Sequence, residues 1–382
     1  MQTGKKKILI ISVTDQDSDP RVIRQIDFLK DEYDIFGCGI SNRALSPEKF
    51  YKISINRRSL PVKIVTGSMI LMKMFDRAEK YILRSKIKAE FSEDQVPEFD
   101  LIIANDLDSI PIAFKKFRSK KVIADLHEYA PEEFEDKLYW KLFHKKYMIH
   151  QCSKYFPLLS GATTVCKSIA EVYNKNFGVL PVVITNAANY NDLKPMPVGE
   201  KIRIIHHGVA VSSRKIEIMI EAAKMIDNRF TFDLMLIPNE KDYYNKLKVS
   251  IAGTKNIKMI EPVSFNEIIP FCNSYDIGLF ILPPVNINYK YALPNKFFEF
   301  IQSRLAVITG PSVEMKNIIR EYELGISTET FETGEIAGKI NALTTEQISF
   351  YKKNSGKHAM ELSSERNKII LNNLVSKILT GQ

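Results

Sequence analysis

Short apolar runs rich in β-branched residues alternate with helical patterns along the whole chain. The runs are continuously apolar, which is typical of parallel strands whose two faces are both covered by helices. This pattern predicts an α/β fold built of parallel sheets. In the first half the predicted strands are residues 7–13, 34–40, 101–104, 122–124, 162–165 and 182–185. In the second half they are residues 203–206, 232–237, 257–260, 277–282, 306–309 and 324–327.

The length of the chain predicts two domains. A chain of 382 residues is long enough for two separate cores. Residues 191–200, which contain two prolines and a glycine, are the best linker candidate. We therefore expect a doubly wound, Rossmann-like domain over residues 1–195 and a second one over residues 200–345. We expect the charged helical tail, residues 346–382, to pack back on the first domain.

The composition is that of an ordinary soluble protein, with 45% hydrophobic and 26% charged residues. The longest apolar stretch, residues 64–72, is interrupted by residues 66–68 and falls short of the roughly 20 residues that span a bilayer. The apolar run at residues 8–13 is too short for a signal peptide and ends at an aspartate-rich segment. The four cysteines are scattered without a CxxC pair, so we expect reduced thiols in a cytoplasmic protein.

The net charge of +9 indicates an anionic partner: a nucleotide, an anionic lipid surface or a nucleic acid. No DNA- or RNA-binding motif is present, so we expect no nucleic acid. Within residues 137–154, Lys137, Lys141 and Lys145 fall on one helix face among aromatic residues. Such a helix either lies on an anionic membrane surface, at the inner face of the membrane, or is a solvated amphipathic helix. Both interpretations stay open.

Polar residues follow the predicted strands of the first half, where ligands bind in parallel sheets. After the first strand, Ser18 or Asp19 can cap a helix that begins at Pro20, with Arg21 near its start. No glycine is present there, which excludes a dinucleotide-binding loop. Later strands are followed by Asn105, Asp106 and Asp108, and by Asp125, His127 and Glu128. His127 is a candidate active-site residue or a hydrogen-bonded loop histidine, and three adjacent residues without a distant ligand make a metal site improbable.

The second half carries two segments suited to a nucleoside diphosphate. His207-Gly208 follows a strand, and Arg214 and Lys215 are expected at the next helix start, where an arginine chelates phosphate oxygens. The alternative is a solvated basic first turn, which the helix dipole disfavours. Further on, Asn295 is expected to cap a helix with Glu299 in its first turn. That arrangement suits a phosphate and ribose hydroxyls, or is an ordinary acidic first turn.

Several of these segments together resemble the GT-B glycosyltransferases, in particular the retaining family 4. The matching features lie in order between residue 7 and about residue 327. They are Ser18-Asp19-Pro20-Arg21-Val22, Asp125-Leu126-His127-Glu128, Thr163-Thr164-Val165-Cys166, Asn186-Ala187, His207-Gly208 with Arg214 and Glu217, and Leu293-Pro294-Asn295-Lys296 with Phe298-Glu299.

The resemblance implies two domains facing across a cleft, with a nucleotide-sugar donor bound by the second and the acceptor by the first. Transfer to a saccharide or lipid-linked saccharide would proceed with retention and without an essential metal, in surface polysaccharide or glycolipid synthesis. Arg214 and Lys215 would bind the diphosphate, Glu299 the ribose, and His127 would lie near the donor sugar. The implied donor-binding residues are Gly208, Arg214, Lys215, Leu293, Asn295, Lys296 and Glu299. Those on the acceptor side are Asp19, Arg21, Asp106 and Glu128.

Two departures from the family pattern leave alternatives open. Tyr291 stands where the first glutamate of the E-x7-E pattern belongs, and residues 15–19 are rich in aspartate where the family has a glycine-rich loop. One alternative is a nucleotide-sugar epimerase of the same fold that uses carboxylates such as Asp106, Asp108 or Glu128. The other is a non-catalytic partner subunit that has lost turnover.

Overall fold

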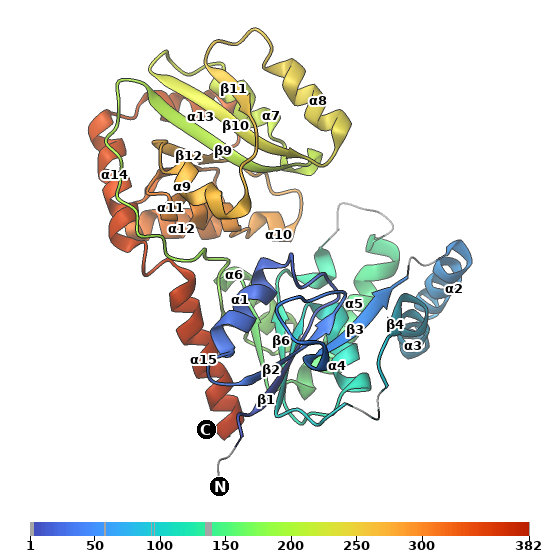
Figure 1. Ribbon diagram of the computed structural model, residues 1–382. Coiled ribbons are helices and arrows are strands. Elements are labelled where there is room, and N and C mark those ends of the chain that lie inside the picture. Colours follow the sequence, from blue (N-terminus) through green and yellow to red (C-terminus); the bar gives the residue numbers. More distant parts are fainter. Residues whose placement is uncertain (1–3, 57–58, 93, 95, 134–139, 382) are drawn as a thin grey trace. The chain divides into compact units, whose positions relative to one another are not determined.

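The structure is a computed structural model that describes residues 4–56, 59–92, 94, 96–133 and 140–381. It divides into two compact units (Figure 1). Unit 1 comprises residues 1–184 and 368–382, and unit 2 comprises residues 185–367. The tail therefore differs from the expectation: residues 346–367 belong to unit 2, and only the end of the chain from residue 368 belongs to unit 1.

Unit 1 is built on an eight-stranded sheet with the order β4-β3-β2-β1-β5-β6-β7-β8. All neighbouring strands are parallel except β3 and β4. The strands are β1 (Lys7–Ile11), β2 (Asp34–Gly39), β3 (Phe50–Ile55), β4 (Ile87–Ala89), β5 (Leu101–Asn105), β6 (Val122–Leu126), β7 (Gly161–Thr164) and β8 (Val182–Val183). The strand order reverses between β1 and β5, so the carboxyl ends of these strands are where a ligand is expected.

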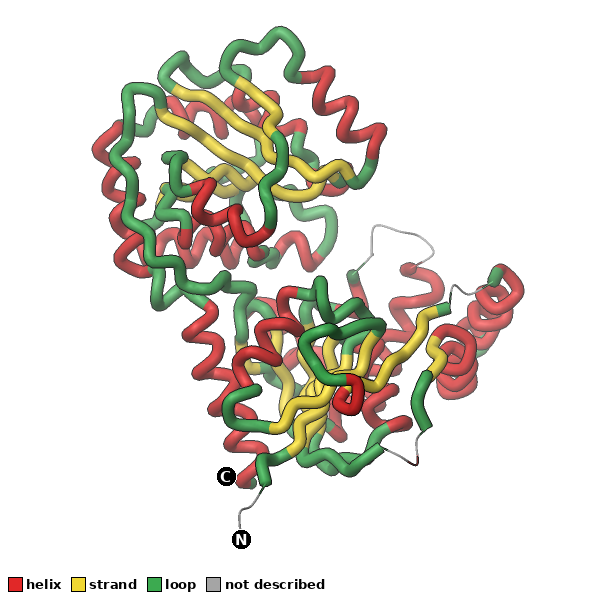
Figure 2. Tube along the Cα trace, viewed as in Figure 1, coloured by secondary structure: helices red, strands yellow, loops and turns green. Residues whose placement is uncertain are grey.

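Helices flank the unit 1 sheet (Figure 2). They are α1 (Pro20–Leu29), α2 (Leu60–Leu71), α3 (Phe75–Lys86), α4 (Ile110–Lys116), α5 (Lys145–Tyr155), α6 (Lys167–Phe177) and α15 (Ser364–Thr380). Helix α1 begins as predicted, because the Asp19 carboxylate accepts hydrogen bonds from the backbone N–H groups of Arg21 and Val22. Apolar residues of β1, α1 and α15 share one buried core, which ties the end of the chain to unit 1.

Unit 2 has a six-stranded, all-parallel sheet with the order β11-β10-β9-β12-β13-β14. The strands are β9 (Ile202–Ala210), β10 (Phe230–Pro238), β11 (Ile257–Ile260), β12 (Ile277–Phe280), β13 (Ala306–Thr309) and β14 (Gly325–Ser327). The helices are α7 (Glu217–Ala223), α8 (Lys241–Ser250), α9 (Ile268–Cys272), α10 (Ile287–Lys290), α11 (Asn295–Gln302), α12 (Val313–Tyr322), α13 (Thr333–Asn341) and α14 (Thr345–His358). Here the order reverses between β9 and β12.

Every strand predicted from the sequence is present, and the mixed α/β fold with two doubly wound sheets is confirmed. Strands β3 and β4 were not predicted because both are only partly buried, and polar residues interrupt their apolar pattern. Strand β4 is the edge strand of the sheet, and β3 lies next to it. All four cysteines are free and buried. Within the described ranges, no helix combines the length and apolar character needed to cross a membrane.

Candidate functional site

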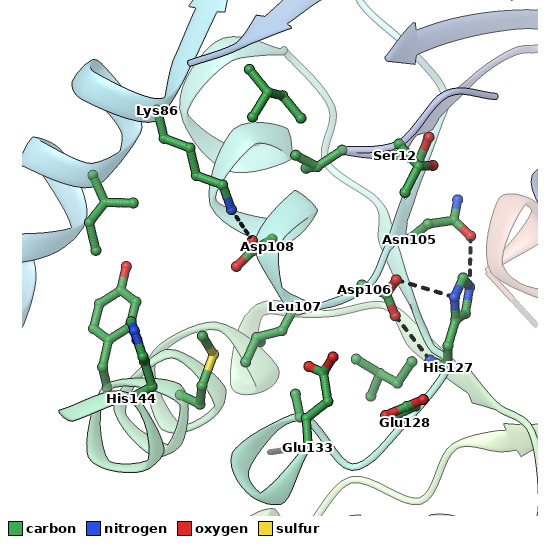
Figure 3. A pocket seen from close by; sticks show the side chains of 18 of the residues that line it. Ser12, Lys86, Asn105, Asp106, Leu107, Asp108, His127, Glu128, Glu133 and His144 are labelled. Atoms are coloured by element: carbon green, nitrogen blue, oxygen red, sulfur yellow. Dashed lines mark hydrogen bonds and ion pairs between the residues drawn. The ribbon is translucent and has the colours of Figure 1, made fainter. Parts of the chain in front are cut away.

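Unit 1 contains a pocket of about 610 Å³ beside the carboxyl ends of β1, β5 and β6 (Figure 3). Ser12, Asn105 and His127 line it from the ends of these strands. Asp106 and Glu128, which were predicted on the acceptor side, also line it. The other two acceptor-side residues do not: Asp19 caps α1, and Arg21 is buried in an ion pair.

A buried hydrogen-bond network lies beneath this pocket and is centred on Asp125. Arg21 binds both carboxylate oxygens, at 2.5 Å through Nε and 2.6 Å through Nη2, and also donates to the Ile184 carbonyl. Gln25 donates to Asp125 at 2.6 Å, and the Thr163 hydroxyl donates to it as well. Burial would raise the pKa of Asp125, but the Arg21 guanidinium outweighs it and holds this pKa well below its usual range. The strand-end carboxylate thus orients neighbouring groups and is itself shielded from a ligand.

His127 lines the pocket beside Asp106 and Asn105 (Figure 3), and its other neighbour is the buried carboxylate of Asp125. Its Nδ1 lies 3.2 Å from Asp106, and its Nε2 lies 3.3 Å from both Asp125 and Asn105. Burial favours the neutral ring, but the Asp106 carboxylate and then Asp125 outweigh it and raise the pKa of His127 to about 10. The ring is therefore an imidazolium at pH 7, which donates hydrogen bonds and accepts no proton.

The raised pKa of His127 makes the stability of unit 1 depend on pH. A histidine raised from about 6.5 to about 10 stabilises the fold fully below pH 6.5, and this contribution disappears as the pH rises to 10. We expect the difference in free energy of unfolding between the wild type and His127→Gln to shrink over this range. Urea titrations followed by fluorescence of Trp140, the sole tryptophan, measure it in unit 1. A difference that grows with pH would contradict the assignment.

The remaining polar residues of the pocket carry mixed charge. Lys86 on α3 pairs with Asp108 at 2.6 Å, and Glu128 and Glu133 lie on the other side (Figure 3). Desolvation and then the Asp106 carboxylate raise the pKa of Glu128. In the part of the chain that is described, no group of three histidine, cysteine or acidic residues is placed to hold a metal ion. The lining of carboxylates, amides and an imidazolium suits a polyhydroxylated ligand.

The basic segment at residues 137–154 is organised differently from the predicted stripe. Lys137 lies outside the described residues. The described part of this segment begins with a π-helical turn, Trp140–His144, which continues directly into α5. Lys141 is exposed, whereas Lys145 pairs with Glu132 at 2.8 Å. One of the three lysines is thus ion-paired within unit 1.

In unit 2, a group of buried polar residues gathers where β9 and β12 flank the reversal of strand order. Strand β9 continues to Ala210, so Gly208 lies within the strand and does not follow it as predicted. Gly208 has φ of 137°, and a Cβ atom there would lie 2.6 Å from the Nζ of Lys296 and 3.6 Å from Arg214. Only glycine admits both cations so close to the backbone.

Lys296 is the most unusual residue of this group. Its side chain is 7% exposed, and among the described residues its Nζ has no hydrogen-bond partner. The ammonium lies over the Phe280 ring, 4.7 Å from the centroid. Burial, and then the Arg214 charge, lower the pKa of Lys296 to about 7 although Glu299 raises it. A buried amine without a hydrogen-bond partner is costly, and an anionic ligand bound at this position would offset that cost.

The predicted pair of Arg214 and Lys215 separates in the structure. Both precede α7, which begins at Glu217, so neither lies in a basic first turn and the helix-dipole argument does not apply. Arg214 is half-buried near Gly208, and its Nη1 donates to the Val209 carbonyl at 3.2 Å. Lys215 is exposed and lies 4.0 Å from Glu217. Lys296, not Lys215, is the second cation beside Arg214.

The start of α11 also corrects the prediction. Pro294 is the N-cap, Asn295 makes no side-chain cap, and no acidic residue lies in the first turn. Glu299 lies beyond that turn and its carboxylate is 3.5 Å from Nε2 of His207. Burial, and then Lys296, lower the pKa of His207 to about 3, so this histidine is neutral. Leu293, just before the helix, accepts a hydrogen bond from Asn186 through its carbonyl.

Gln25 and Lys86 are among the residues of these sites that were not predicted. Gln25 donates hydrogen bonds to Asp125 and Asn105. It lies four residues after Arg21 and therefore on the same helix face, and this spacing could have pointed to it as a second residue of the network. Lys86 lines the pocket from the end of α3. No sequence pattern pointed to it, because the strand that follows it was itself not predicted.

Comparisons with known proteins address the fold. No model of a protein family matches the sequence, and neither does any curated protein. Among solved structures, HepE (Alr3699) of Anabaena in complex with UDP-glucose has a TM-score of 0.67 at 14% identity, over 97% of this chain and 99% of that one. Sucrose-phosphate synthase of Thermosynechococcus elongatus has a TM-score of 0.69 at 10% identity, over 99% and 100%. An α,α-trehalose-phosphate synthase (UDP-forming) of Burkholderia vietnamiensis has a TM-score of 0.63 at 10% identity, over 99% of each chain.

The chain has the GT-B fold. The similarity extends over almost the whole of each GT-B protein, so both units are included. At this level of identity the comparison establishes the fold alone.

Proposed function

We propose that this protein is a glycosyltransferase that moves a sugar from a nucleoside diphosphate to an acceptor hydroxyl. Unit 2 would hold the donor and the pocket of unit 1 the acceptor. The observation that carries the proposal is the buried Lys296 ammonium, which lies beside Arg214 and Gly208 without a hydrogen-bond partner among the described residues. Two cations at the carboxyl end of a parallel sheet, with a backbone open to close approach, suit a diphosphate.

The proposed chemistry assigns these cations to the leaving group. The bond between the anomeric carbon and the diphosphate oxygen breaks, a bond from that carbon to the acceptor oxygen forms, and the proton of the acceptor hydroxyl passes to the departing diphosphate. Negative charge develops on the diphosphate, where Arg214 and Lys296 would stabilise it. Because the solved structure of HepE contains UDP-glucose in the same fold, a uridine diphosphate sugar is the first donor to test.

On the acceptor side, His127 would act as a hydrogen-bond donor and not as a base. Its imidazolium is held by Asp106 and Asp125, so it is positioned to bind a sugar oxygen. Retention at the anomeric carbon, a ribose contact to Glu299 and independence of a metal ion are further parts of the proposal, on the resemblance to family 4. We also propose a saccharide or lipid-linked saccharide acceptor, in surface polysaccharide or glycolipid synthesis.

A ligand screen tests the donor assignment. Melting curves and calorimetry with UDP, GDP, ADP, CMP and their sugar conjugates, with magnesium or EDTA, should show selective stabilisation by one nucleoside diphosphate. Ligand at 100 times its Kd stabilises the folded state by about 2.7 kcal/mol. Arg214→Ala should abolish this effect, while Lys215→Ala, its exposed neighbour, should preserve it. If no nucleotide binds, or if both variants bind equally, the proposed donor site is wrong.

A further inference from the structure

Helix α2 exposes an apolar face that none of the described residues of unit 1 covers. Of its exposed side chains, Leu60 is 70%, Ile64 59% and Leu71 61% accessible, and Met72 directly after the helix is 71% accessible. At 100° per residue these positions, with Pro61 and Val65, fall on one continuous side of the helix, broken only by Ser68. An exposed apolar face of this kind marks an interaction surface.

The buried side of α2 has the opposite character. It presents Thr66, Gly67 and Ile70 to the unit. Gly67 faces the Phe143 ring, and Ile70 packs in a small cluster with Ala78 of α3 and Tyr147 of α5. The helix therefore buries one large apolar residue, Ile70, beside a small and a polar one, while most of its larger apolar residues face outward. Packing within unit 1 does not account for this arrangement.

The surroundings of this face are strongly cationic. Helices α2 and α3 lie side by side at the edge of unit 1 (Figure 1), and α2 also contacts the turn Trp140–His144. Seven exposed lysines and arginines lie on α2, on α3, in the loop between them and on the 140–155 segment, and none of them is ion-paired within the described ranges. They are Lys63, Lys73, Arg77, Lys80, Arg84, Lys141 and Lys146. The only acidic residues of these segments, Asp76 and Glu79, are already held by Lys154.

This combination of positive charge and apolar surface favours one kind of binding partner for the outer face of α2. A second copy of the chain, docked about a twofold axis, would place the cationic rim against itself. An anionic lipid surface complements both features, because the apolar side chains enter the acyl region and the lysines and arginines meet the headgroups. We propose that the outer face of α2 is the site at which this protein binds an anionic membrane.

The position of α2 deepens the proposed function. Ile82, Tyr147 and Met148 belong to the cluster that holds α2 and also line the pocket of unit 1. A membrane bound at α2 would therefore lie next to the proposed acceptor pocket, which suits an acceptor carried on a lipid. This last step rests on the proposed function, whereas the membrane contact rests on unit 1 alone.

Flotation with lipid vesicles tests the membrane contact without any donor, acceptor or turnover. The full chain should float with vesicles of phosphatidylcholine and phosphatidylglycerol, and about tenfold less with phosphatidylcholine alone. The triple variant Leu60→Ser, Ile64→Ser and Leu71→Ser should bind anionic vesicles about tenfold less. A matched triple variant at exposed apolar positions elsewhere, Leu180→Ser, Val249→Ser and Phe265→Ser, should bind like the wild type.

Three outcomes would overturn the proposal. They are a full chain that fails to float with anionic vesicles, equal binding by the two triple variants, and a dimer in light scattering that only the α2 variant loses. The last would assign the face to a second copy. Trp140 fluorescence verifies that unit 1 of each variant is folded. Because flotation requires no nucleotide, a failed donor screen leaves this result intact, and the reverse also holds.

Discussion

Replacement of Lys296 by methionine should lower kcat/KM for the nucleotide-sugar donor by about 10²–10³-fold, which corresponds to about 3–4 kcal/mol of transition-state stabilisation. The reason is that the ammonium would counter the charge that develops on the departing diphosphate. The same change should leave the melting temperature unchanged or raise it. It removes a buried cation that has no hydrogen-bond partner among the described residues and extends an apolar side chain over Phe280. Initial rates and thermal unfolding measure the two effects.

Lys352 provides the matched control in the same unit. It is also buried, at 1% exposure, but its Nζ binds Asp276 at 2.8 Å and the Tyr275 carbonyl at 2.7 Å. Lys352→Met should therefore destabilise unit 2 by about 3–5 kcal/mol, because it leaves Asp276 buried without its counter-charge. At temperatures where the variant is folded, its kcat/KM should be close to that of the wild type. If Lys296→Met destabilises as Lys352→Met does and keeps full activity, Lys296 is a structural lysine and the donor site is misplaced.

Replacement of Asp125 by asparagine should destabilise unit 1 by about 3–5 kcal/mol. The carboxylate is 1% exposed and faces two cations, the Arg21 guanidinium and the His127 imidazolium. The neutral amide leaves Arg21 buried without a counter-charge and turns an N–H group towards the donors that surround it. Urea unfolding followed by Trp140 fluorescence reports on unit 1, because the sole tryptophan lies there.

Asp108→Asn is the control for this prediction. Asp108 pairs with Lys86 at the pocket wall, but its side chain is 43% exposed, so the change should cost less than about 1 kcal/mol. The double variant Arg21→Met with Asp125→Leu should be more stable than the single Asp125→Asn variant, since both charges are removed together. Equal stability of Asp125→Asn and Asp108→Asn would show that the buried pair does not organise this site.

The strands beside the candidate sites were predictable because a buried strand shows its apolar pattern within its own few residues. Residues 122–124 and 277–282 are apolar runs of the kind found in a covered parallel sheet, and β6 and β12 form there. Strand β3 was not predictable in this way, because it is only partly buried and polar residues interrupt its apolar pattern.

Only the tertiary structure shows which charged side chains lie together. Arg214 and Lys215 are adjacent and have the same sign, yet one lies near Gly208 and the other faces solvent, since Lys215 adopts a left-handed conformation that turns it away. Lys296 joins Arg214 from another helix, about eighty residues along the chain. No local pattern encodes that approach, because it depends on where α11 meets β9.

Helix α2 shows the same difference between what the sequence predicts and what only the tertiary structure shows. The apolar stretch at residues 64–72 was visible in the sequence, but apolar residues of a helix are buried in most proteins, so its outward orientation was not. The sequence by itself determined the strands, the α/β class and the segments that carry the chemistry, because these depend on local apolar periodicity and on residue type. Only the tertiary structure decided which cations gather around Gly208, that Asp125 is buried beneath the pocket, and that α2 faces outward. These features depend on contacts between residues far apart in the chain, which determine the burial and the charge partners of each side chain.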